Sequence, residues 1–207
     1  MMDLTDAFAL CGWALAACAC VLRLLWFERL PGSLVKVIMM ISLFAGLLNP
    51  ISNSGLPIAA YLRGIGGDLS ITLLALCVWS LSHRLAGVAT MAKREQTILL
   101  AVISGAALLL YPTALGWGNW DAYRLGWGSW WFLAILFGIC VMGAGLGLRV
   151  LPALIALALL SWSFGLMEST NLWDYLLDPW LSAYALGFVF IKCWQSAFRR
   201  LHNRSPH

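Results

Sequence analysis

The sequence contains few charged residues. Only 11% of its 207 residues are Asp, Glu, Lys or Arg, while 62% are hydrophobic, and an ordinary soluble domain carries roughly 25% charged residues. A protein surface in water needs charge to stay dispersed. The composition therefore excludes an ordinary soluble domain and predicts an all-α integral membrane protein that forms a single transmembrane domain.

The sequence also lacks the motifs of common catalytic and metal sites. Its six cysteines all fall in apolar runs and form no CxxC pair, which a structural zinc site or a redox pair would need. There is no phosphate-binding loop and no nucleophile motif, and two of the three histidines belong to the C-terminal tail. We therefore expect no cofactor and no metal, and we favour a non-enzymatic function.

The N-terminus lacks the basic residues of a secretory signal peptide. The chain begins MMDLTDAFAL, with Asp3 and Asp6 ahead of the first apolar run. We therefore expect this run to be retained as a membrane-spanning helix.

Seven apolar segments have about the length of a membrane span, for which a helix needs about 20 apolar residues. Some begin with helix-start signals, such as Asp178 before Pro179. The turn between the fifth and sixth segments is very short, and a re-entrant pair there would change the topology. The expected helices are approximately 7–27, 33–49, 68–88, 97–115, 129–148, 150–167 and 179–198.

The charges between these segments sort by sign. If the N-terminus is outside, the inner connections and the C-terminal tail hold eleven bases and two acids, and the outer segments hold two bases and seven acids. Cytoplasmic loops of membrane proteins carry an excess of Lys and Arg. We therefore expect a multi-pass protein of a bacterial inner membrane with a cytoplasmic C-terminus. Its basic tail, residues 199–207, is expected to contact anionic lipid rather than nucleic acid.

A five-residue pattern, Ala-Tyr-x-x-Gly, begins at Ala60, Ala122 and Ala183. The first two copies extend further, because Pro50 and Pro112 each precede the alanine by ten positions. One interpretation is a parallel repeat of two-helix hairpins related by an axis along the membrane normal. The other is that Tyr anchors at the interface and Gly allows close packing, without any repeat.

Polar and aromatic residues concentrate in the outer segments, where they define an expected periplasmic mouth. Carboxylates beside indole rings suit a glycan or a lipid head group, and they are also typical of an aromatic belt with a few solvated acids. Both interpretations stay open. The candidate ligand-binding residues are Tyr61, Arg63, Asp68, Trp117, Trp120, Asp121, Tyr123, Arg124, Glu168, Asp174, Tyr175 and Asp178.

The two outer bases, Arg63 and Arg124, have two interpretations. We prefer ion pairs with Asp68, Asp121 or Glu168 that hold two hairpins together near the membrane boundary, where isolated charges are costly. The alternative is that one Arg is free to bind a phosphate or carboxylate through its planar fork.

Glu168 follows an apolar segment directly, so we expect it to be partly desolvated at the outer interface. Such a carboxyl suits a general acid or a proton-coupled site. If the helix continues, Glu168 shares a face with Tyr175, and Asp174 shares another with Asp178.

Three functions follow from these residues. The first is an envelope component, either a subunit of a membrane assembly or a small permease, that engages a polar ligand, lipid head group, glycan or protein partner from outside. The second is a membrane-embedded enzyme acting on a lipid-linked substrate, with Glu168 or Asp174 as acid or base. The third is a purely structural subunit. In each case the bilayer and a membrane-protein partner or a second copy are the expected partners.

Overall fold

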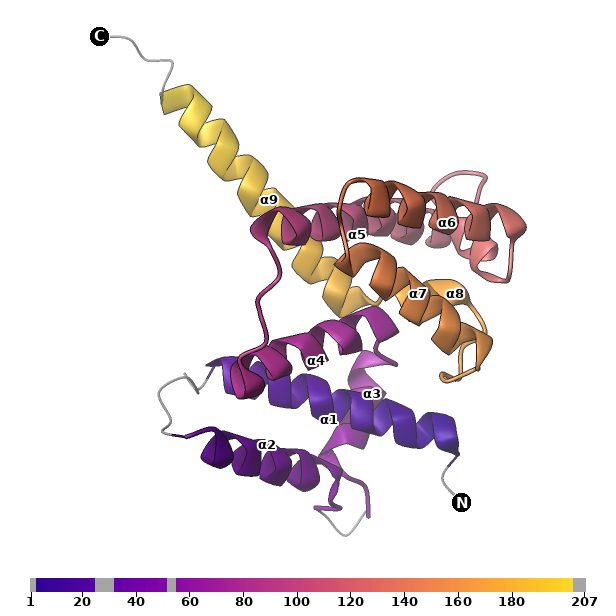
Figure 1. The fold of residues 1–207 in the computed structure, drawn as a ribbon. Helices are drawn as coiled ribbons and strands as arrows, with labels where there is room; N and C mark the ends of the chain where they lie inside the picture. The colour runs from indigo at the N-terminus through magenta and orange to yellow at the C-terminus, as the bar shows by residue number, and fades with distance from the viewer. Residues whose placement is uncertain (1–2, 25–31, 52–54, 203–207) are drawn as a thin grey trace. The chain divides into compact units, whose positions relative to one another are not determined.

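The computed structural model describes residues 3–24, 32–51 and 55–202 (Figure 1). Within these residues the regular structure is helical and contains no strand, apart from one isolated bridge between Pro50 and Pro57. The prediction of an all-α protein is therefore confirmed for the described part of the chain. The chain divides into two compact units, which are described separately below.

The first unit comprises Met1–Thr90 and Leu154–Leu176. In it α1 (Leu4–Leu24) packs against α2 (Ser33–Leu48), α3 (Ile58–Gly66) and α4 (Ile71–Ala86), and α8 (Leu172–Leu176) packs against α4.

Small residues on α1 let its neighbours approach closely. Ala14 and Cys18 pack with Leu47 of α2. A Cβ atom added at Gly12 would lie 3.2 Å from a methyl carbon of Leu74.

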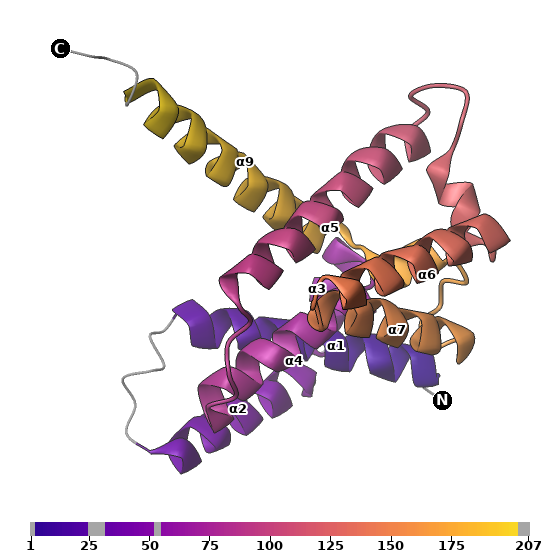
Figure 2. The ribbon, with the colours of Figure 1, turned by 45° about the horizontal axis from the view of Figure 1, so that its top comes forward.

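Acidic and basic residues of α1 and α4 lie at opposite ends of this helix group. In Figures 1 and 2, α1 and α4 run in the same general direction and α2 runs in the opposite one, so the starts of α1 and α4 and the end of α2 share one end. Asp6 is in the first turn of α1. The opposite end has Arg23 in the last turn of α1 and Arg84 in the last turn of α4.

The second unit comprises Met91–Ala153 and Leu177–His207. Here α5 (Lys93–Ala114) packs against α9 (Pro179–His202) and against the 3-10 helix η2 (Ala122–Gly126), which also contacts α6 (Trp130–Gly145). The start of α5 holds the turn after α6, because one carboxylate oxygen of Glu95 accepts hydrogen bonds from the backbone N–H groups of Arg149 and Val150, at 2.5 and 2.6 Å. These N–H groups begin α7 (Val150–Ser163), so Glu95 caps a helix from a distant part of the sequence.

Each of the seven predicted segments contains a helix, but they differ in length. By length and composition, α1 and α5 are the two described helices apolar and long enough to cross a membrane. Four others have 14 to 16 residues, or roughly 21–24 Å, against about 30 Å of hydrocarbon. Buried helices of soluble proteins can meet the same criterion as α1 and α5, so seven spans stay a prediction. Residues 25–27 of the first expected span lie outside the described part.

In the described part of the chain, three short helices, α3, η2 and α8, lie in the segments that are predicted to be outside, and two of them contain a copy of the repeated pattern. The first Ala-Tyr-x-x-Gly copy lies within α3, and the second forms η2; each precedes a longer apolar helix. The third copy, at Ala183, lies inside α9 and forms no separate helix. The structure thus gives the first two copies similar local surroundings and sets the third apart.

Candidate functional site

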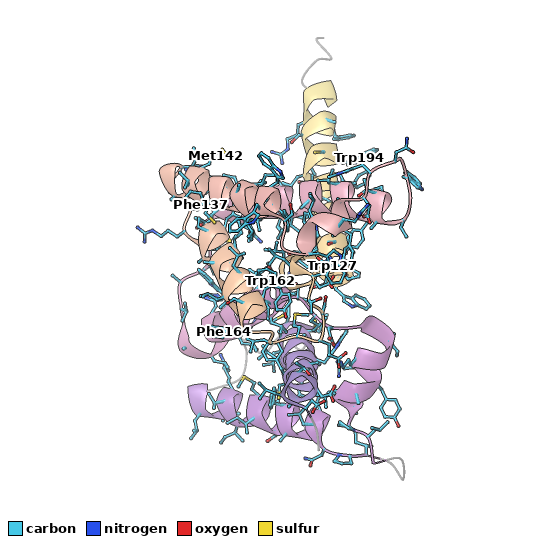
Figure 3. The ribbon with its side chains drawn as sticks, turned by 90° about the vertical axis from the view of Figure 1, so that its right-hand side faces the viewer. Trp127, Phe137, Met142, Trp162, Phe164 and Trp194 are labelled. Atoms are coloured by element: carbon cyan, nitrogen blue, oxygen red, sulfur yellow. The ribbon has the colours of Figure 1, made fainter. Side chains whose placement is uncertain are left out.

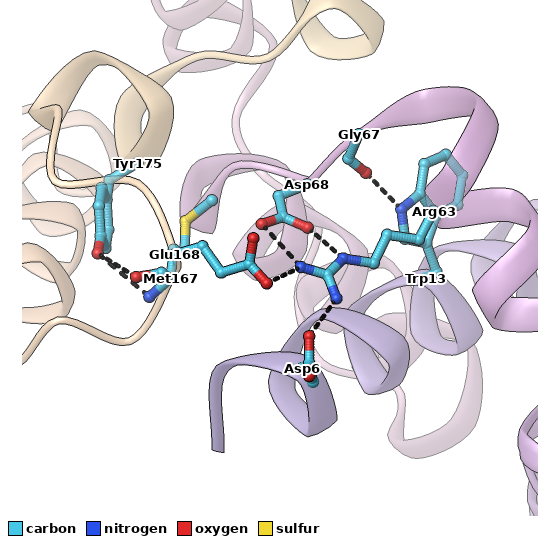
Figure 4. A network of polar contacts seen from close by, with 8 residues as sticks. All are labelled: Asp6, Trp13, Arg63, Gly67, Asp68, Met167, Glu168 and Tyr175. Carbon is cyan, nitrogen blue, oxygen red and sulfur yellow. Dashed lines mark hydrogen bonds and ion pairs between the residues drawn. The ribbon is translucent and has the colours of Figure 1, made fainter. Parts of the chain in front are cut away.

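Arg63 lies at the centre of three carboxylates in the first unit (Figure 4). Its Nε is 2.7 Å from Asp68 Oδ1, one terminal nitrogen is 2.6 Å from Asp6 Oδ1, and the other is 2.7 Å from Glu168 Oε1. The second terminal nitrogen also donates to Asp68 Oδ2 at 3.4 Å. We call these four residues the Arg63 cluster.

A glycine turn brings Asp68 back towards Arg63. Helix α3 ends at Gly66, and Gly67 adopts a φ of 71°, in the left-handed region that favours glycine. The carbonyl of Gly67 accepts a hydrogen bond of 2.7 Å from the indole N–H of Trp13 on α1 (Figure 4). Ser70 then caps α4 by accepting the N–H of Leu73. These bonds fix the backbone on both sides of Asp68.

The members of the Arg63 cluster differ in exposure, so their ion pairs differ in strength. The side chains of Arg63 and Asp68 are 20% and 22% exposed, whereas those of Asp6 and Glu168 are 38% and 58% exposed. The hydrogen bonds that Arg63 donates to Asp68, then those to Asp6 and Glu168, raise the pKa of Arg63 above its already high ordinary value. Arg63 therefore stays cationic, and the exposed Glu168 pair contributes least to stability.

The guanidinium of Arg63 has little capacity left for another acceptor. It carries five N–H donors, and four hydrogen bonds to carboxylate oxygens engage it. The structure places Arg63 in structural ion pairs, and a phosphate would have to displace one of the three acids to be bound by the fork.

A cleft of about 850 Å³ opens beside the cluster. Its charged wall is the Arg63 cluster, and its other walls are mainly apolar side chains from the start of α1, the end of α2 and the start of α3. Gly64 lines the cleft, and a Cβ atom added there would meet no heavy atom within 4 Å. We call this space the Arg63 cleft; its apolar lining includes Ala7, Leu10, Leu48, Pro57 and Ala60.

Glu168 lies farther from the end of its preceding helix than the sequence predicts. Helix α7 ends at Ser163, so Glu168 belongs to a non-helical segment and is 58% exposed. Partial desolvation of Glu168 at a membrane interface stays a prediction. The condition for a face shared by Glu168 and Tyr175, a continuing helix, is not met, because α7 ends at Ser163 and Tyr175 lies on the separate α8.

Tyr175 is instead a buried anchor for this segment. Its side chain is fully buried. Its hydroxyl accepts the backbone N–H of Met167 and donates to the carbonyl of Ser169, each at 3.1 Å. Figure 4 shows the ring of Tyr175 facing Met167, next to Glu168 in the chain. Tyr175 thus positions the segment that presents Glu168.

The two remaining acids of this segment, Asp174 and Asp178, accept hydrogen bonds from residues that are close in the sequence. Asp174 accepts the hydroxyl hydrogen of Ser169. Asp178 is buried and accepts the N–H of Leu181 at 2.8 Å as the N-cap of α9. They do not share a helix face, because α8 ends at Leu176 between them. These hydrogen bonds give Asp174 and Asp178, two of the three acids in this stretch of the sequence, a structural role.

The predicted aromatic residues of the second unit are mainly exposed. Trp117 and Trp120 are 77% and 51% exposed, and Asp121 caps η2 by accepting the N–H of Tyr123 at 2.9 Å. Arg124 is exposed and forms no ion pair with a described carboxylate. Exposed indoles with a capping acid fit the aromatic-belt interpretation.

Large apolar side chains also cover the surfaces of the longer helices of this unit. Figure 3 shows Phe137 and Met142 on α6 and Trp194 on α9 directed away from their helix axes. They are 70%, 62% and 66% exposed, respectively. Such surfaces are unusual in water and suit a hydrocarbon environment.

Of the twelve candidate residues, the structure brings Arg63, Asp68 and Glu168 together, with Tyr61 exposed on the same short helix as Arg63. The candidate list missed Asp6, although the charge sorting placed it on the outer side. It also missed the apolar cleft, which no sequence motif marks. Among the described residues, no group of three or more His, Cys, Asp or Glu side chains is arranged to hold a metal ion.

No protein-family model, curated protein or solved structure matches this chain.

Proposed function

We propose that the chain is a multi-pass protein of a bacterial inner membrane, with its N-terminus outside and its C-terminus in the cytoplasm, and that it binds an amphipathic molecule in the Arg63 cleft from the outer side. The function is one of binding rather than catalysis. The observation that carries it is a cleft with a charged wall and apolar walls at the acidic end of the first unit.

Charge placement supports the proposed sidedness. The acids of the Arg63 cluster and the basic residues Arg23 and Arg84 lie at opposite ends of α1 and α4. Basic residues mark the cytoplasmic side of a membrane protein. This arrangement agrees with the sign pattern along the sequence, and it supports an outer position for the cleft.

The dimensions of the cleft support binding of a small molecule. About 850 Å³ falls within the roughly 300–1,000 Å³ of small-molecule sites, which combine apolar walls with a few polar groups. An amphipathic ligand would place its apolar part against Leu10 and Leu48 and its polar part at the cluster.

The enzyme alternative has less support in this arrangement. Glu168 is exposed and paired with Arg63, and Asp174 accepts a hydrogen bond from Ser169. Each acid therefore already has a structural contact, and no nucleophile motif lies in the sequence beside them.

The test uses the purified chain in a non-ionic amphipol and an uncharged fluorescent probe, dansyl-dodecyl amide. We expect saturable binding to the wild-type protein and at least tenfold weaker binding to Gly64→Leu, whose Cβ meets no heavy atom within 4 Å and whose side chain would project from the cleft wall. Gly46→Leu is the matched control, because that site on α2 is equally open and does not line the cleft. Equal binding to all three proteins would show that the probe binds elsewhere and would refute the proposal.

A further inference from the structure

We infer that the Arg63 cleft selects an amphiphile with a cationic head group, of the primary alkylammonium class. This inference rests on the proposed function, because it assigns the head group of the ligand that the cleft is proposed to bind. Three observations lead to it: the charge of the cluster, the engagement of the arginine and the lining of the cleft.

The Arg63 cluster carries an excess of negative charge. Three carboxylates surround one guanidinium, which leaves a formal excess of two negative charges at the cleft wall. Asp6 and Glu168 are the most exposed of the acids, and each contacts Arg63 through one oxygen only. Asp6 also has hydrogen-bond interactions with the Glu168 side chain and the Asp3 backbone, and the second oxygen of each acid is not bonded to Arg63.

An ammonium group fits this wall in charge and in hydrogen bonding. It offers three N–H donors and no acceptor, and N–H bonds from a cation to a carboxylate are about twice as strong as those between neutral groups. Binding would bring the cluster closer to neutrality. A metal ion is a poorer match, because the carboxylates are arranged around the edge of the Arg63 guanidinium, which already occupies the space between them.

An anionic head group meets the opposite conditions. Four of the five N–H donors of Arg63 are engaged, so a phosphate would have to displace a carboxylate and would then lie among three acids. A neutral sugar head group could accept from or donate to the acids, but it would leave the excess charge in place. The cleft should therefore rank head groups as cationic, neutral and anionic, in decreasing affinity.

The apolar lining of the cleft determines which chemistry the ligand needs beyond its head group. The walls opposite the cluster are contributed by residues such as Ala7, Leu10 and Pro57, which suit a hydrocarbon chain. A hydrophilic amine without such a chain would lose this contact.

The experiment measures displacement of dansyl-dodecyl amide by three twelve-carbon amphiphiles: dodecylammonium, dodecyl maltoside and dodecyl phosphate. We expect dodecylammonium to bind about tenfold more tightly than the maltoside, as expected for a charge-assisted contact, and dodecyl phosphate to bind more weakly than both. The advantage of the cation should decrease as salt is raised.

Two neutralising variants connect this preference to the cluster. Glu168→Gln and Asp6→Asn should each reduce the preference for dodecylammonium over the maltoside at least threefold. Asp121→Asn is the matched control, because it removes one outer acid that does not line the cleft and keeps the oxygen that caps η2; it should leave the preference unchanged.

The outcomes separate the inference from the proposed function. If the uncharged probe binds in the cleft but the three head groups bind equally, or the phosphate binds most tightly, the inference is wrong and the proposed function stands. If Gly64→Leu weakens the binding of none of these amphiphiles, both the inference and the proposed function are wrong. Micelle effects are excluded by working below the critical concentration of each amphiphile.

Discussion

Replacing Arg63 with methionine leaves three carboxylates facing one another without the guanidinium that holds them together. Methionine keeps most of the side-chain length and removes the charge. The three acids come from the start of α1, the turn before α4 and the segment after α7. The substitution therefore removes a contact shared by three parts of the first unit.

The magnitude follows from the exposure of each pair. The Asp68 pair is the most buried and uses two oxygens, so it should contribute about 1.5–3 kcal/mol, as is typical of hydrogen bonds to charged groups. The exposed Glu168 pair should add at most about 1 kcal/mol. Removing one partner of a fully buried pair costs about 3–5 kcal/mol. We therefore expect Arg63→Met to lower the free energy of unfolding by roughly 2–4 kcal/mol, because the cluster is only partly buried.

The assay is thermal unfolding of the purified protein in a mild non-ionic detergent. A loss of this size corresponds to a decrease in Tm of about 4–16 °C for a chain of this length. Arg124→Met is the matched control, because Arg124 is exposed and forms no ion pair with a described carboxylate; its effect should stay within about 0.5 kcal/mol. Arg63→Lys should fall between the two, since an ammonium keeps the charge and loses the planar fork.

A specific order of effects tests the reasoning. Arg63→Met should destabilise more than Asp68→Asn, and Asp68→Asn more than Glu168→Gln. If Arg63→Met and Arg124→Met shift Tm equally, the cluster does not stabilise the first unit, and the structural account of Arg63 is refuted.

Three further predictions concern contacts away from the charges of the cleft. Glu95→Ala removes the cap at the start of α7 and should cost about 0.5–2 kcal/mol, whereas Glu95→Gln keeps an acceptor oxygen and should cost less. Tyr175→Phe leaves the buried N–H of Met167 without its acceptor and should cost about 1–3 kcal/mol. Gly12→Leu forces α1 away from Leu74 and should cost about 1–3 kcal/mol. Each is measured by unfolding in the same detergent.

Each of these predictions has a control and a contradicting outcome. Tyr184→Phe changes an exposed Tyr of α9, and Gly46→Leu changes an open Gly of α2, so both should have little effect. Equal losses for Tyr175→Phe and Tyr184→Phe, or for Gly12→Leu and Gly46→Leu, would contradict the packing described here. For the helix cap, Glu95→Gln as destabilising as Glu95→Ala would mean that the charge of Glu95 matters rather than its acceptor oxygen.

The helical segments could be predicted from the sequence because their apolar runs are long and bounded by charge, Pro or Gly. Such runs do not fix where a helix ends. The apolar run before Glu168 continues past Ser163, but the chain turns at Gly165, which has a φ of 61°. The predicted helix is therefore four residues longer at its C-terminal end than α7.

The candidate site could be predicted in part. The pairing of Arg63 with Asp68 could be predicted, because Arg63 is one of only two bases in the acidic outer segments predicted from the sequence and Asp68 follows it by five positions. The contact with Glu168 depends on where the segment after α7 lies relative to Arg63 on α3, and no local pattern contains that information. The cleft depends on small and apolar residues from three helices, whose arrangement arises only on folding.

The most direct test of the central claim is the sidedness of the Arg63 cleft. Single cysteines are placed at Leu56, which lines the cleft, and at Val88, beyond the opposite end of α4, in a protein whose six native cysteines are replaced by alanine. A membrane-impermeant maleimide added to intact spheroplasts should label Leu56→Cys, and it should label Val88→Cys only after permeabilisation. Labelling of Val88→Cys in intact spheroplasts with Leu56→Cys protected would place the cleft in the cytoplasm and contradict the proposed orientation.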